Sequence, residues 1–334
     1  MEKIDLKDRK ILYILTQNAR LPTNRLARMV GLSKDAVLYR IKRLERMGVI
    51  CKYFTRMNLD SLGYNSFQLT LSLSPKKEEM EKIIGHISAH PFCMNAFTLL
   101  GRWDVLAEFA VRNDEDVYKI VSEVSGVCGG ALNDLEVKTC AFLYKKTNMM
   151  DAVGETGLRP FSTRRGASVH KGPAKLDAKD AAVLRSLDSN GRKRIVDMVK
   201  ETGLERDVVG YRKANLEALE IIEGYGVDLN VSMLGFRSYY IEFGLKNITP
   251  EYEAKLRAYF KTQKGVTYGF HAANSLGGVA FFTARGPSEL HETLLEFRNN
   301  FLPVMRSLEV MTVLKEHKFD FFPEGIAREI AGKE

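Results

Sequence analysis

The chain has 334 residues, of which 45% are hydrophobic and 28% are charged, a composition typical of a globular protein with several small cores. It contains no run of about eighteen apolar residues and no apolar signal stretch at its start, so we expect a cytoplasmic protein without a membrane span. Its four cysteines form no CxxC pair, so neither a disulfide framework nor a metal site is expected. No cofactor is expected either. The net charge of +8 is weak evidence for nucleic-acid binding by itself, and the positions of the charged residues decide what it indicates.

Three helices and a strand are predicted at the start of the chain. Apolar residues at helical spacing after Asp5 predict a first helix, and a short second helix is predicted over 23–30. Gly31 ends the second helix, Ser33 caps a third, and 49–54 is predicted to start a β-wing. This order is that of a winged helix-turn-helix.

The third helix has one apolar and one cationic face. Val37, Ile41 and Leu44 share a face and are expected to point into the three-helix core. The opposite face belongs to the helix that this motif places in the major groove of double-stranded DNA. The candidate DNA-binding residues are Ser33, Lys34, Asp35, Tyr39, Arg40, Lys42, Arg43 and Arg46.

A βαββαβ unit follows the wing. The predicted elements are strands at 67–73, 94–100, 105–111 and 135–144 and helices at 75–89 and 114–124. This order predicts a ferredoxin-like sheet with its helices on one face and the other face bare. A bare face is usually covered by a second copy, so we expect a homo-oligomer or pairing within the chain.

The chain then repeats itself. A shift of 172 residues aligns Asn18 with Asn190, and a shift of 173, after one inserted residue, aligns Phe109 with Phe282. The expected class is therefore α+β with two such repeats. The expected domains are a winged helix-turn-helix at 1–60, a ferredoxin-like domain at 61–146, a linker rich in Gly and Pro at 147–174, a second, degenerate winged helix at 175–232, a second ferredoxin-like domain at 233–320 and a C-terminal tail at 321–334.

Several motifs of the first repeat resemble the Lrp/AsnC family of transcriptional regulators. They are Ile4, Asp5 and Asp8, the Gly31-Leu32-Ser33 turn, the stretch 40–45, Gly48-Val49-Ile50, and the hairpin Gly101-Arg102-Trp103-Asp104. The resemblance implies a regulator rather than an enzyme, paired sheets, and a small effector, commonly an amino acid, bound beside the hairpin. It thus implies effector binding by Gly101, Arg102, Trp103 and Asp104.

The two copies differ in charge. Residues 1–56 hold 14 Lys and Arg against 5 Asp and Glu, a net charge of +9, whereas 173–228 hold 10 against 11, a net charge of −1. The basic residues Lys42, Arg43 and Arg46 are replaced by Ala214, Asn215 and Ala218. We therefore expect weak DNA binding by the second winged helix, although Arg192, Lys193 and Arg194 retain some positive charge. The second hairpin, at 274–278, has no aspartate matching Asp104.

Three alternatives stay open at this point. Siroheme decarboxylases resemble the family in architecture, and His271, Asn274 and Phe281-Phe282 weakly resemble their histidine- and asparagine-containing strand. The second repeat could also make the chain a metabolite-sensing adaptor without DNA binding. The apolar segment 319–323 is expected to pack on the last sheet, with a docking strand as the alternative.

Overall fold

The computed structural model describes residues 3–74, 76–146, 172–273 and 275–332. Nearly all of the predicted linker at 147–174 lies outside the described residues. Within the described ranges, no helix is long and apolar enough to cross a membrane.

Each repeat begins with a three-helix domain. The helices are α1 (Leu6–Gln17), α2 (Thr23–Val30) and α3 (Lys34–Arg46) in the first repeat and α8 (Ala178–Ser189), α9 (Ile195–Thr202) and α10 (Arg206–Ala218) in the second. Asp5 and Asp177 each start the first helix with a capping box, in which the side chain accepts the N–H of the residue three positions on. Gly31 ends α2 in the left-handed conformation, as its position in the turn predicts.

The strand after each third helix pairs across the repeats. Strand β1 (Ile50–Met57) runs antiparallel to β6 (Ile222–Leu229), so the predicted β-wing is corrected to one strand of a ribbon shared by both repeats. Its partner could not be seen locally, because it lies more than a hundred residues away in the sequence. Val227 and Leu229 of β6 join the core of the first winged helix, which ties each three-helix domain to the other repeat.

The remaining elements form two βαββαβ units. The first contains β2 (Asn65–Leu73), α5 (Lys77–Ala89), β3 (Cys93–Leu100), β4 (Val105–Val111), α6 (Asp114–Cys128) and β5 (Leu132–Lys146). The second contains β7 (Arg237–Leu245), α11 (Pro250–Thr262), β8 (Val266–Ala272), β9 (Gly277–Ala284), α12 (Pro287–Phe301) and β10 (Met305–Phe319). Short helical turns lie at α4 (Leu59–Leu62), η1 (Gly129–Ala131) and η2 (Val231–Leu234).

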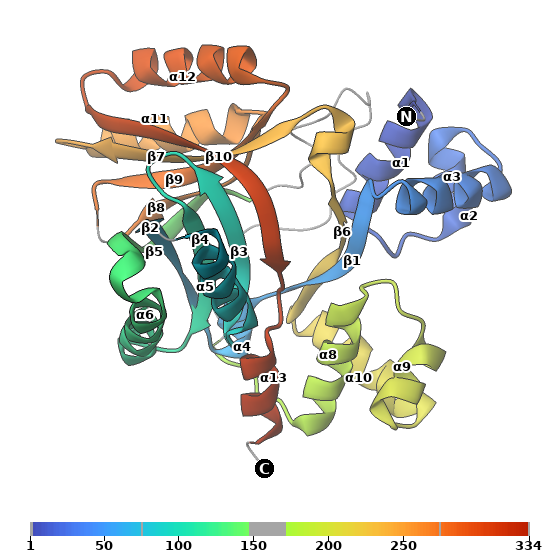
Figure 1. Ribbon diagram of the computed structural model, residues 1–334. Coiled ribbons are helices and arrows are strands. Elements are labelled where there is room, and N and C mark those ends of the chain that lie inside the picture. Colours follow the sequence, from blue (N-terminus) through green and yellow to red (C-terminus); the bar gives the residue numbers. More distant parts are fainter. Residues whose placement is uncertain (1–2, 75, 147–171, 274, 333–334) are drawn as a thin grey trace.

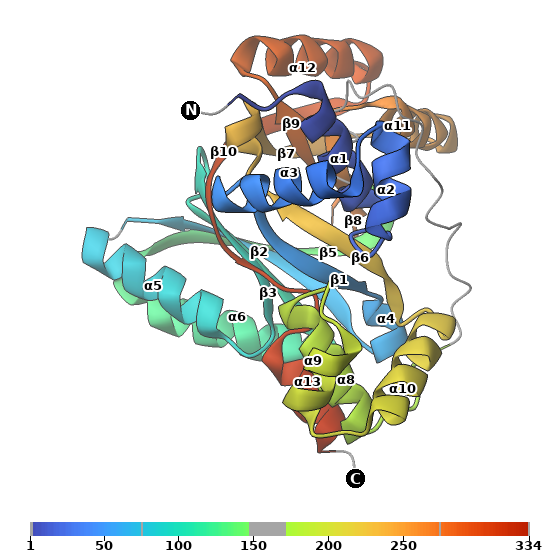
Figure 2. The same cartoon turned by 90° about the vertical axis from the view of Figure 1, so that its right-hand side faces the viewer.

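The two sheets close on each other as one barrel within the chain. Its strand order is β10-β3-β4-β2-β5-β8-β9-β7. The long strands β5 and β10 leave their own sheets halfway: β5 pairs with β2 and then β8, and β10 with β7 and then β3. The helices cover the outside of the barrel, while both three-helix domains lie together on one side (Figure 1) and face the viewer in Figure 2.

The C-terminal segment folds as a helix, α13 (Glu324–Ala331), rather than as a tail on the last sheet. Phe322 is fully buried in the core of the second winged helix, and α13 lies against α8 (Figure 1). The Gly325 N–H donates to the Pro91 carbonyl of the first repeat. The C-terminal segment therefore contacts both the second winged helix and the first ferredoxin-like domain and connects them.

Candidate DNA-binding surface and the hairpin at the repeat junction

Helix α3 presents the face that its sequence predicts. Val37, Ile41 and Leu44 are buried in the core of the first winged helix. The Ser33 hydroxyl accepts the Ala36 N–H and so caps the helix, which orients its N-terminal turn. The predicted residues that lie exposed on this helix are Lys34, Asp35, Tyr39, Lys42 and Arg46.

Arg40 and Arg43 belong to a different group. One Arg40 nitrogen lies 2.8 Å from both Asp5 Oδ2 and Asp8 Oδ1, and Arg43 lies 2.5 Å from Asp8 Oδ2. The Asp8 side chain is fully buried, so these contacts compensate its charge and bind α3 to the start of α1. Hydrogen bonds to Asp5 and Asp8 also raise the pKa of Arg40. The two guanidinium groups thus hold the domain together instead of projecting from it.

Two further cations lie on α2. Arg25 and Arg28 are exposed, because Leu26, Ala27 and Val30 occupy the buried side of this helix. The 172-residue shift places Asp197 and Lys200 at their positions in the second repeat. The exposure of Arg25 and Arg28 could have been predicted from the sequence, because a helical projection of 23–30 separates the two arginines from the apolar side.

The outer face of α10 in the second winged helix has fewer cations than that of α3 and keeps the exposed Arg206 at its start. Ala214, Asn215 and Ala218 are exposed where the first copy has its basic residues, and Tyr211 is 72% exposed. Arg212 repeats the structural role of Arg40, with its nitrogen 2.6 Å from Asp177 Oδ1 and 2.8 Å from Asp180 Oδ1. The internal ion pair is therefore kept in both copies, whereas the outer cations Lys42 and Arg46 are found in the first copy and Arg206 keeps the position of Lys34 in the second.

The three basic residues 192–194 of the second copy have local partners. The Arg192 guanidinium stacks 4.9 Å from the centre of the Tyr53 ring in the ribbon. Lys193 Nζ lies 2.5 Å from Glu201 Oε2, and Arg194 Nε lies 2.7 Å from Asp197 Oδ2. Part of the positive charge that the sequence places beside α9 is thus balanced within the domain.

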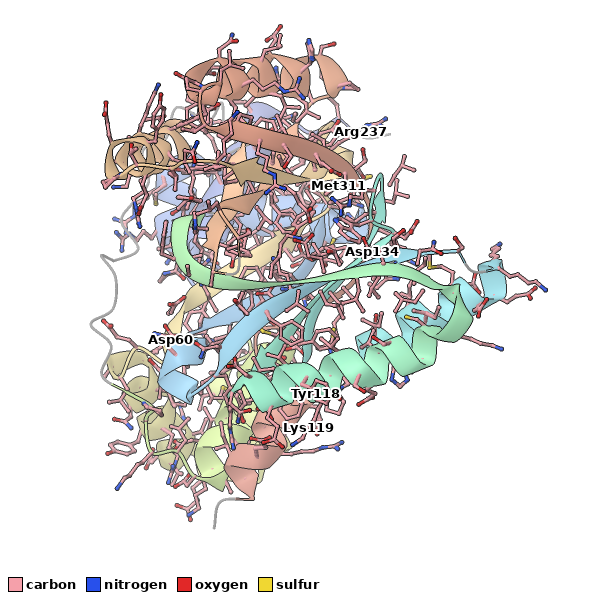
Figure 3. The ribbon with its side chains drawn as sticks, turned by 90° about the vertical axis from the view of Figure 1, so that its left-hand side faces the viewer. Asp60, Tyr118, Lys119, Asp134, Arg237 and Met311 are labelled. Carbon is pink, nitrogen blue, oxygen red and sulfur yellow. The ribbon has the colours of Figure 1, made fainter. Side chains whose placement is uncertain are left out.

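The hairpin Gly101–Asp104 lies where the first repeat meets β10. Gly101 has φ +153°, and a Cβ there would lie 2.8 Å from Met311 Cγ, so this contact requires glycine. Asp104 Oδ2 accepts the Leu73 N–H at 2.7 Å, which fixes the turn to β2. Figure 3 labels Met311 on β10 and Asp134 on β5, the two long strands that flank the junction.

Trp103 is buried inside the barrel. Its side chain is fully inaccessible, and its Nε1–H donates to Glu242 Oε2 of the second repeat at 3.1 Å. Arg102 covers the ring at 4.6 Å and pairs with Glu309 Oε1 at 3.2 Å, while its own side chain is 47% exposed. Of the predicted effector residues, Gly101 and Arg102 are therefore at the surface, Asp104 is half-buried, and Trp103 forms part of the contact between repeats.

These features define a winged helix-turn-helix protein whose paired ferredoxin-like domains come from one chain. The family model for winged helix-turn-helix DNA-binding matches residues 4–50. The transcriptional regulator AldR of Mycolicibacterium smegmatis is 34% identical over 36% of this chain and 71% of its own length. The regulator LrpA of Pyrococcus horikoshii is 31% identical over 38% of this chain and 89% of its own. The chain therefore belongs to the Lrp/AsnC family of transcriptional regulators, as its motifs predict.

A solved structure also resembles the whole chain in fold. The siroheme decarboxylase NirDL covers 97% of both chains with a TM-score of 0.58 and 14% sequence identity. This similarity shows a shared arrangement of two repeats. The predicted α+β class, with a winged helix and a ferredoxin-like domain in each repeat, is thus confirmed.

Proposed function

We propose that this regulator binds double-stranded DNA sequence-specifically through α3 and α2 of its first winged helix. The observation that carries the proposal is the exposed group Lys34, Tyr39, Lys42 and Arg46 on the helix that enters the major groove in this motif. Exposed cations supply the phosphate contacts that dominate affinity, whereas Arg40 and Arg43 are occupied by buried carboxylates. The second winged helix contributes less, since Ala214 and Ala218 replace Lys42 and Arg46 and Arg206 alone remains, at the position of Lys34.

The test compares charge-matched double variants of the full chain. Binding to a fluorescent duplex of about thirty base pairs is followed by anisotropy between low and moderate salt. K42A/R46A is expected to reduce the slope of log K against log salt by about 1.8, from 0.9 for each lost phosphate contact. The control K200A/R206A removes two exposed cations from the second winged helix and should leave the slope unchanged. Equal effects of the two pairs would refute the assignment to the first copy.

We further propose that a small effector, such as an amino acid, binds at the Gly101–Asp104 hairpin. This proposal is supported by the position of the hairpin at the junction of the two repeats. A ligand bound by Arg102 there would also face Glu309 and Asp134. A thermal-shift screen of the full chain against the common amino acids tests this, with R102A as the variant and K119M as a surface control. A ligand that stabilises R102A as strongly as the unaltered chain would argue against this site.

A second candidate is a tetrapyrrole-binding role. The full-length fold similarity to siroheme decarboxylase, also solved with an iron-uroporphyrin III analogue, favours it. His271 has its Nδ1 2.7 Å from the Tyr144 hydroxyl and stacks on Phe142, and burial lowers its pKa. Titration with iron-uroporphyrin III, followed by absorption in the Soret region, decides the matter: an unchanged spectrum counts against this role.

A further inference from the structure

The interior of the barrel carries a polar group that joins the two repeats. On β7, Tyr239 and Ile241 pack against the outer helices, whereas Tyr240 alternates with them and points inward. Glu242 lies two residues on and shares this inward side, as strand geometry requires. Both repeats supply inward residues, so the contents of the barrel depend on which two sheets are paired.

The group is held by short contacts between charged and polar atoms. Lys138 Nζ of β5 lies 3.0 Å from Glu242 Oε1 and 2.7 Å from Glu136 Oε2. The other Glu242 oxygen accepts the Trp103 indole N–H at 3.1 Å. The Lys138 and Glu242 side chains are only 5% and 10% exposed, so Glu242 depends on Lys138 as its cation, while Lys138 shares its charge between Glu242 and Glu136.

The same positions are not charged in the opposite repeat. Strands β2 and β7 have equal length, and so do β5 and β10, which makes the correspondence direct. Lys138 corresponds to Met311, and Glu242 corresponds to Thr70. The inward residues Tyr240 and Gln68 occupy corresponding positions in the two repeats. The Tyr240 hydroxyl donates to Gln68 Oε1 at 3.0 Å. The repeats are therefore complementary rather than equivalent.

Pairing of like repeats would break the contacts that cross between the repeats, namely those of Glu242 with Lys138 and Trp103 and that of Tyr240 with Gln68, whereas Lys138 would keep Glu136 of its own strand. Two first repeats would enclose two copies of Lys138, each facing Thr70 in place of Glu242 and left with Glu136 alone, and two indole N–H groups without the Glu242 acceptor. Two second repeats would enclose two copies of Glu242, each facing Met311, and two Tyr240 rings in the space of one ring and one amide. Burying a charge without its partner is strongly unfavourable, and an extra ring overpacks the interior.

We infer that the first repeat selects the second repeat as its partner and excludes a copy of itself, in contrast to a symmetric homodimer of single repeats. The recognition chemistry is a buried lysine and indole N–H on one sheet and a buried carboxylate on the other. This property concerns pairing of the sheets and is independent of the DNA-binding role proposed above.

The first experiment cuts the full chain after it has folded. A protease site placed within 150–165 is cleaved, the two fragments are unfolded and refolded together, and native mass spectrometry identifies the pairs. Only the mixed pair is expected for the unaltered sequence, and self-pairs of the first fragment are expected to emerge in K138M. Lys119, exposed on the outside of α6 (Figure 3), provides the control K119M, which should behave as the unaltered chain. A mixture near one quarter, one half and one quarter for the unaltered chain would overturn the inference.

The second experiment uses the uncut chain and needs no exchange of fragments. Denaturant unfolding is measured for K138M, E242T and the double variant, which insert the residues of the opposite repeat. K138M leaves Glu242 without a cation and E242T leaves Lys138 with Glu136 alone, so the double variant is expected to lose less stability than the sum of the two. Strict additivity would show that the two side chains do not recognise each other and would overturn the inference.

Discussion

Alanine substitutions of two arginines one turn apart on α3 are expected to have different effects, one on stability and the other on DNA binding. Arg43 is 17% exposed and bound to the buried Asp8, whereas Arg46 is exposed at the last turn of the helix. Replacing Arg43 with alanine removes one charged hydrogen bond from Asp8. Asp8 retains its contact with Arg40 and the N–H of Asp5, so the loss is partial. A hydrogen bond to a charged group contributes about 1.5–3 kcal/mol, which suggests a cost of about 1–2 kcal/mol here.

The second repeat agrees with a partial loss of stability at this site. Asn215 stands at the corresponding position, and Asp180 there is paired with Arg212. The domain has thus kept its fold with one arginine at this site. Within the described part of the chain, the exposed Arg46 is not bound to a buried carboxylate, so Arg46→Ala should change the free energy of unfolding by less than about 0.5 kcal/mol. Loss of its phosphate contact should instead reduce DNA affinity roughly fivefold to tenfold at 0.1 M salt.

Both quantities are measured on the same preparations of the full chain. Denaturant unfolding gives the stability change, and anisotropy titration of duplex DNA at several salt concentrations gives affinity and salt slope. Arg43→Ala should lower the unfolding midpoint with an unchanged salt slope under conditions in which the protein is folded. The reasoning is refuted if Arg43→Ala reduces the slope as much as Arg46→Ala without any loss of stability.

Further predictions concern the C-terminal segment and the hairpin. Phe322→Ala should cost about 3–5 kcal/mol in denaturant unfolding, because the ring is fully buried; a cost below 1 kcal/mol would contradict its place in this core. Burial and the neighbouring Asp320 raise the pKa of Asp188 to about 8, so the folded protein binds a proton that the unfolded chain releases near pH 4. Stability should therefore fall as the pH rises from about 4 to 8, and Asp188→Asn should weaken this dependence, to which the raised pKa of Glu316 also contributes. A profile unchanged by Asp188→Asn would exclude Asp188 as a source. Gly101→Ala should lower the melting temperature, since its φ is left-handed and its Cβ would meet Met311. Because Met311 is itself fully buried, Met311→Ala is also destabilising, and the double variant should lose less stability than the sum of the two single variants; strict additivity would contradict the contact.

The sequence determined the features that depend on local periodicity and composition. The spacing of apolar residues predicted the three helices of the first winged helix and the strands of its ferredoxin-like domain, because a buried face repeats with the period of its own element. The register at 172 and 173 residues revealed the duplication, and the loss of Lys42, Arg43 and Arg46 from the second copy revealed the charge difference.

Tertiary structure decided everything that depends on partners distant in the chain. Helical spacing placed Arg43 beside Arg46 on one cationic face, but the buried carboxylate of Asp8 draws Arg43 into the domain. The ribbon of β1 and β6, the helix α13 on α8 and the pairing of both sheets in one chain likewise rest on long-range contacts. Trp103 shows the physical reason most clearly: the hairpin suggested a ligand-binding residue, whereas its burial and its bond to Glu242 arise only when the second repeat closes the barrel.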